Sequence, residues 1–153
     1  MIDPPVMAER AALYAAVIAL VIPRGDIPKH FAAAVAEIRA ELARQGIAPA
    51  GPVFAHHLRM PPGMFDLEIS VPVARPVTAA GRVESRDEPA RAVAQTTYHG
   101  DYPGLFAAWS AFGDWIATNG HVPASDLFET YLSDPVRVTD PARYETLLER
   151  PLA

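Results

Sequence analysis

Two stretches of the chain carry apolar residues at helical spacing, at positions i, i+4, i+7 and i+11. Such a stripe is typical of the buried face of an amphipathic helix. A glycine follows each stretch, at Gly46 and Gly120, where a helix commonly ends. The pattern therefore predicts two helices with the same offset of 74 residues at every position. The stripes are Phe31, Val35, Ile38 and Leu42, and then Leu105, Trp109, Phe112 and Ile116.

Strand-like patterns flank both helices. Residues 17–22 and 93–98 are apolar runs that precede them, and residues 67–73 (LEISVPV) and 146–152 (TLLERPL) alternate in the manner of strands. A further strand is expected after each helix, at residues 54–58 and 128–132. The order strand–helix–strand–strand is thus predicted twice.

The two halves also match residue by residue. The run QGIAPAGPVFAHHL at 45–58 aligns without a gap to NGHVPASDLFETYL at 119–132, and Pro72 aligns with Pro151 if residues 133–141, which include Pro135, carry a five-residue insertion. We expect a first repeat at about 12–73, a connector at 74–90 and a second repeat at about 91–152, all within one domain of residues 1–153. The identical pairs are Gly46/Gly120, Pro49/Pro123, Ala50/Ala124, Phe54/Phe128 and Leu58/Leu132.

The predicted fold class is α+β. Neither unit covers its own sheet well, so the units are expected to join into one curved antiparallel sheet with two main helices. A groove is expected where the halves meet, because ligands commonly bind at such junctions.

Composition and charge exclude several classes of protein. The chain has 153 residues, of which 50% are hydrophobic and 20% are charged, which excludes a disordered chain. The net charge of −5 argues against a nucleic-acid-binding face, and the absence of cysteine excludes disulfides and thiolate chemistry. The apolar run at 11–22 is too short to cross a bilayer, and no signal peptide is evident. We therefore expect a cytoplasmic protein without a membrane or nucleic-acid partner.

Glu129 is the leading candidate for a functional residue. Phe128 and Leu132 match Phe54 and Leu58, so their face of the strand is expected to pack, and Glu129 and Tyr131 then point to the other side. A carboxylate in an apolar strand is costly unless it is paired or solvated. An exposed charge on the sheet is one reading, and a pocket that takes an organic cation is the other.

Aromatic residues favour the pocket. Tyr98, Tyr102 and Tyr144 are candidate ligand contacts beside Tyr131. Trp109 aligns with Val35, which favours packing in the core first and lining of the groove second. His57 is a candidate because it is equivalent to Tyr131 in the first repeat.

No cofactor or metal site is expected. His56 and His57 are adjacent on a strand and point to opposite faces, and no metal-binding spacing, nucleotide loop or serine nucleophile motif is present.

The runs HGDYPGL, DLFETYLSDP and LLERPL resemble the GyrI-like effector-binding domain family, over roughly residues 12–152. The resemblance implies that Glu129 meets cationic, lipophilic ligands, with Tyr131 beside it and Tyr144 as the aromatic residue of the last strand. In this family the domain serves as the drug-sensing half of transcription activators and as free-standing proteins, and we expect a stand-alone member. One departure is Asp101, where the family often has proline or a small residue.

Three functions remain open from the sequence. The first is binding of lipophilic, aromatic or cationic compounds, for drug sensing or sequestration. The second is hydrolysis of strained cyclopropane-bearing natural products in the same pocket, with Glu129 as general base and Tyr131 assisting. The third is interaction with gyrase, although no partner surface can be identified.

Overall fold

A computed structural model describes residues 1–134 and 136–153. Both predicted helices are present, as α1 (Ile27–Gln45) and α2 (Leu105–Thr118). Pro135, in the predicted insertion, lies outside the described residues. The strands are β1 (Val6–Arg10), β2 (Leu13–Pro23), β3 (Phe54–Arg59), β4 (Met64–Val73), β5 (Glu84–Glu88), β6 (Arg91–His99), β7 (Leu127–Tyr131) and β8 (Glu145–Pro151). Three short 3₁₀ helices are η1 (Arg24–Asp26), η2 (Tyr102–Gly104) and η3 (Pro141–Arg143).

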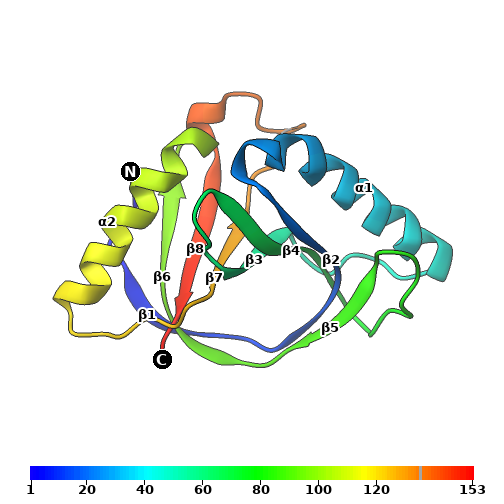
Figure 1. The fold of residues 1–153 in the computed structure, drawn as a ribbon, viewed down its shortest axis with the longest axis horizontal. Helices are drawn as coiled ribbons and strands as arrows, with labels where there is room; N and C mark the ends of the chain where they lie inside the picture. Colours follow the sequence, from blue (N-terminus) through cyan, green and yellow to red (C-terminus); the bar gives the residue numbers. More distant parts are fainter. Residues whose placement is uncertain (135) are drawn as a thin grey trace. The chain divides into compact units, whose positions relative to one another are not determined.

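The chain divides into two compact units. The first unit is Ala11–Ala90, and the second unit is Arg91–Ala153 together with Met1–Arg10. Each unit is a four-stranded antiparallel sheet with one helix, in the strand order β5-β2-β4-β3 in the first unit and β1-β6-β8-β7 in the second. Helix α1 packs on β2 and β4, and α2 packs beside β6 (Figure 1). The α+β class, the antiparallel pairing and the two main helices are confirmed.

The duplication extends to individual hydrogen bonds. Ala50 N–H donates to the Pro72 carbonyl at 2.8 Å, and Ala124 N–H donates to the Pro151 carbonyl at the same distance. Gly46 and Gly120, which end the two helices, both have positive φ, at 69° and 75°. Both features fall at positions that the sequence alignment pairs with each other.

The segment predicted as a connector contains a strand. β5 lies within residues 74–90 and pairs with β2 of the first unit, while β1, which precedes the predicted first repeat, pairs with β6 of the second. The edge strand that precedes the first repeat, β1, therefore belongs to the second unit. The edge strand that precedes the second repeat, β5, belongs to the first unit. Each edge strand is only five residues long, and β5 (ESRDE) contains no apolar residue, so alternation of apolar residues did not reveal them.

None of the helices among the described residues is both long and apolar enough to cross a membrane.

Candidate functional site

Glu129 lies in β7 on the side of the sheet that α2 covers. It is directly opposite Leu148 of β8, and directly opposed residues of antiparallel strands share a face. Leu148 in turn packs in one core cluster with Phe112 and Ile116 of α2. The Glu129 side chain is 92% buried on this face, since the residue is only 8% exposed.

The prediction about the two faces of β7 was only partly correct. Phe128 is fully buried, as expected, but Leu132 is 45% exposed because β7 ends at Tyr131. The helix covers the face that carries Glu129, so both faces of β7 are buried at this point rather than one.

Two neutral donors hold the Glu129 carboxylate. The Trp109 indole N–H donates to Oε2 at 2.7 Å, and the Tyr131 hydroxyl donates to Oε1 at 3.0 Å. Hydrogen bonds to a charged acceptor are stronger than neutral ones, and a donor on each oxygen fixes the plane of the carboxylate. Because both donors are uncharged, they orient the group without cancelling its negative charge.

Three tyrosine rings form an aromatic group with this carboxylate. Tyr102 meets Tyr131 edge to face, with ring centroids 5.8 Å apart, and lies 5.2 Å from the ring of Tyr144. The face of an aromatic ring attracts cations, and tilted or edge-to-face pairs are favourable ring geometries. Tyr102 is also 40% exposed, so this group reaches the surface of the second unit.

A turn after β6 places Tyr102 beside Tyr144. Gly100 N–H donates to the Tyr144 carbonyl at 2.9 Å, and the Tyr98 hydroxyl donates to the Asp101 carbonyl at 2.8 Å. Gly100 has a φ of 149°, in the region that favours glycine. These contacts fix the start of η2, and with it the position of the Tyr102 ring.

The environment of these tyrosines keeps them protonated. Burial raises the pKa of Tyr131 well above its ordinary value, and the negative charge of Glu129 and the hydrogen bond to it add to this effect. Burial also raises the pKa of Tyr102, with Tyr144 and Glu129 contributing. Tyr131 therefore remains a hydrogen-bond donor to Glu129 at neutral pH.

The structure brings five of the seven predicted ligand contacts together within the second unit. Tyr98 is buried in the core with α2 and holds the turn rather than lining the aromatic group. His57 belongs to the first unit, where its ring meets Phe65 at 5.1 Å. The five that meet are Glu129, Tyr131, Tyr102, Tyr144 and Trp109.

The expected position of Tyr144 needs correction. Tyr144 was expected on the last strand, but β8 begins one residue later, and Tyr144 instead ends the 3₁₀ turn η3. Trp109 packs against the core cluster, the role expected first, and its half-buried indole also donates its N–H to Glu129.

A cavity of about 410 Å³ lies beyond the end of β7 in the second unit. None of the seven predicted contact residues lines it, so it does not correspond to the Glu129 cluster. Its lining residues are Leu132, Ser133, Asp134, Arg137, Val138 and Glu145.

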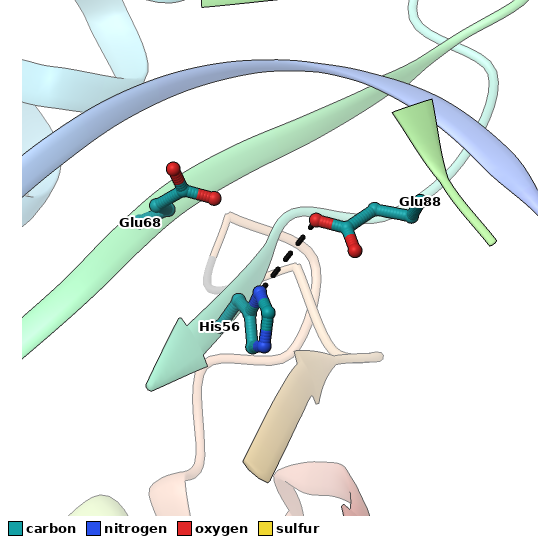
Figure 2. A group of neighbouring side chains, drawn as sticks. All are labelled: His56, Glu68 and Glu88. Carbon is teal, nitrogen blue, oxygen red and sulfur yellow. Dashed lines mark ion pairs between the residues drawn. The ribbon is translucent and has the colours of Figure 1, made fainter. Parts of the chain in front are cut away.

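Sequence spacing missed a second group of polar residues, in the first unit. His56, Glu68 and Glu88 are buried and gather their ligand-type atoms within 4.8 Å of one another (Figure 2). These three are residues of the described chain that could hold a metal ion.

Comparison with known proteins identifies the family. The model of the GyrI-like small molecule binding domain matches residues 4–152. The chain belongs to this family, and it is a small-molecule-binding domain of the α+β class described above. Among curated proteins no match was found.

Solved structures share the fold at low sequence identity. The crystal structure of the EcmrR C-terminal domain is 16% identical with a TM-score of 0.87, and the match covers 98% of this chain and 97% of that one. The EcmrR chain in the EcmrR–DNA complex is 17% identical, with a TM-score of 0.85 over 97% of this chain. The match covers only 57% of that EcmrR chain.

Two further structures differ in what they are described to do. SAV2435, solved with bound tetraphenylphosphonium, is 12% identical with a TM-score of 0.65, covering 99% of this chain and 94% of that one. A hydrolase from Listeria innocua is 16% identical with a TM-score of 0.67, covering 97% and 91%. At such identities these matches show the fold alone.

Proposed function

We propose that this protein binds lipophilic, aromatic or cationic small molecules at the cluster of Glu129, Tyr131, Tyr102, Tyr144 and Trp109. One observation carries the proposal: a buried carboxylate has a neutral donor on each oxygen and three tyrosine rings close by. A delocalised organic cation matches this chemistry, since it pairs with the carboxylate and contacts the rings at a low cost of desolvation.

The pairing of Glu129 with Tyr131 favours binding over catalysis. Two hydrogen bonds fix the orientation of the Glu129 carboxylate, which suits electrostatic recognition of a bound cation. Tyr131 holds its proton firmly because burial raises its pKa. The tyrosine is thus suited to orient the carboxylate rather than to deliver a proton to a leaving group.

Two of the related structures support this assignment by analogy. SAV2435 was solved with tetraphenylphosphonium, a lipophilic cation, and EcmrR carries the same fold within a chain that binds DNA. We propose that residues 1–153 work as one effector-binding domain in the cytoplasm, in drug sensing or sequestration. The groove expected between the two repeats remains a prediction.

Calorimetry with tetraphenylphosphonium tests the binding function. Titrations use the wild-type chain, Glu129→Gln, and Glu145→Gln as a matched control, since Glu145 is an exposed carboxylate at the start of β8. Triphenylphosphine oxide serves as a neutral analogue of the probe. We expect Glu129→Gln to weaken binding of the cation about 10-fold or more, and Glu145→Gln to change it less than about 2-fold.

All three proteins should bind the neutral analogue with the same affinity. Equal affinity of wild-type and Glu129→Gln protein for the cation would show that Glu129 does not select ligands. Absence of binding by every lipophilic cation tried would reject the proposed function itself.

Hydrolysis is the second candidate function. A hydrolase from Listeria innocua has a similar fold, and in β7 the Tyr131 hydroxyl is hydrogen-bonded to the Glu129 carboxylate. Incubation with cyclopropane-bearing electrophiles, followed by mass spectrometry, detects a ring-opened product that has gained water. Turnover that disappears in Glu129→Gln and Tyr131→Phe would establish this function, and absence of turnover across several such compounds would count heavily against it.

A further inference from the structure

Three strands of the first unit contribute one buried metal-ligating side chain each. His56 comes from β3, Glu68 from β4 and Glu88 from β5, and their exposed fractions are 7%, 3% and 8%. Figure 2 shows the imidazole and the two carboxylates turned toward one another. This cluster belongs to the first unit and shares no residue with the Glu129 cluster of the second unit.

Curvature of the sheet, and not sequence spacing, brings the three together. Glu68 lies directly opposite both His56 and Ala19, whereas Glu88 lies opposite Leu13. Six residues of extended strand cover about 20 Å. The ligand atoms nevertheless lie within 4.8 Å, so the strands coil until the end of β5 reaches β3.

One distance in the cluster suits two ligands of a common ion. His56 Nδ1 and Glu88 Oε1 are 3.6 Å apart. A direct N–H···O hydrogen bond is about 2.7–3.2 Å long. Two ligands on one tetrahedral zinc, at bonds of about 2.0–2.1 Å, are separated by about 3.3 Å. The ligand atoms of all three residues lie within 4.8 Å of one another.

The charge in this region also favours a divalent cation. Arg86 donates to Glu68 Oε2 at 2.7 Å, but the same guanidinium also donates to Glu84 Oε2 at 2.7 Å. One positive charge is thus divided between two carboxylates, and Glu88 adds a third negative group nearby. A divalent ion between Glu68 and Glu88 would be attracted by both carboxylates.

We propose that His56, Glu68 and Glu88 form a binding site for a divalent transition-metal ion of the zinc type. One nitrogen and two carboxylate oxygens suit zinc, whereas magnesium and calcium favour oxygen ligands alone. Arg86 is a positioning residue, since its hydrogen bond to one oxygen of Glu68 directs the other oxygen toward the ion.

Titration of the metal-stripped, full-length protein with zinc chloride tests the site. Wild-type protein should bind one zinc ion saturably, with magnesium chloride giving no comparable signal. His56→Gln and Glu88→Gln should each weaken zinc binding about 10-fold or more. His57→Gln is the matched control, because His57 is the next residue of β3, is also buried and points to the opposite face; it should change affinity less than about 2-fold.

Wild-type protein alone can also decide the question if a variant does not fold. Zinc should shift the imidazole NMR resonances of His56 and leave those of His57 in place. Absence of saturable one-to-one binding would overturn the proposal. Equal losses in His56→Gln and His57→Gln, or equal responses to zinc and magnesium, would do so as well.

Discussion

The Trp109 indole N–H donates to the Glu129 carboxylate at 2.7 Å, and both members of this pair are replaced by apolar residues in the other repeat. Trp109 aligns with Val35, and Glu129 aligns with Ala55, both of which are buried. The two repeats therefore differ at both of these positions, and the two side chains are in contact in the second unit. The second unit therefore has a hydrogen-bonded polar pair where the first unit has two apolar residues.

The first prediction concerns this hydrogen bond. Trp109→Phe keeps an aromatic ring but removes the donor, and it should lower the free energy of unfolding by about 1–3 kcal/mol because a hydrogen bond to a charged group is lost. It should also weaken binding of tetraphenylphosphonium, since Glu129 loses its fixed orientation. Urea denaturation and calorimetry measure the two effects. Trp115→Phe, in the same helix, is the control, and an equal loss in both variants would show that ring volume alone matters.

Alkaline pH should destabilise the protein through Tyr131. Burial, and then the charge of Glu129, raise the pKa of this residue well above the ordinary value of 10.0. The unfolded chain therefore releases the proton first, so the stabilisation is complete below pH 10 and is lost as pH rises from there through the folded-state pKa. Tyr131→Phe should lose less stability than wild type between roughly pH 9 and pH 11.

Urea denaturation across that range provides the measurement. Tyr14→Phe is a suitable control, because Tyr14 is 40% exposed. Parallel stability curves for wild type and Tyr131→Phe would contradict the assigned environment of Tyr131.

Arg10 should stabilise the second unit through Glu149. The Arg10 guanidinium pairs with Glu149 at 3.3 Å and lies 3.8 Å from the centre of the Phe128 ring. Arg10→Met leaves a buried carboxylate behind and should cost about 3 kcal/mol at neutral pH. Burial raises the pKa of Glu149, and Arg10 opposes that rise.

The cost of Arg10→Met should therefore depend on pH. It should be smallest where Glu149 is protonated and should grow as pH rises through the raised folded-state pKa of Glu149. The double variant with Glu149→Gln should recover part of the loss. A cost that does not vary with pH would show that Arg10 acts through packing alone.

Two glycines of the second unit should respond in opposite directions to alanine. A Cβ on Gly104 would overlap the Tyr98 hydroxyl, whereas a Cβ on Gly113 in α2 meets nothing within 4 Å. Gly104→Ala should destabilise the protein by about 1–3 kcal/mol, and Gly113→Ala should stabilise it by about 0.5–1 kcal/mol. Thermal denaturation measures the stability of both variants. Adding Tyr98→Phe removes the hydroxyl and should reduce the destabilisation caused by Gly104→Ala. A neutral Gly104→Ala would mean that the turn adjusts freely.

The sequence by itself determined the duplicated architecture. Helical stripes, strand alternation and aligned glycines and prolines are local signals that occur once in each half of the chain. The backbone hydrogen bonds from Ala50 to Pro72 and from Ala124 to Pro151 join residues that the sequence alignment pairs in the same way. The sequence also singled out Glu129, because a carboxylate in an apolar strand is conspicuous.

Tertiary structure decided which side chains meet. Helical and strand periods specify relative faces within one element, but they do not specify which sheet face a helix covers, so the indole of Trp109 could not be assigned to Glu129. Edge strands β1 and β5 were missed because pairing, rather than alternation, defines them. His56, Glu68 and Glu88 come together only because the sheet coils, and coiling sums small twists along many residues that no short motif records.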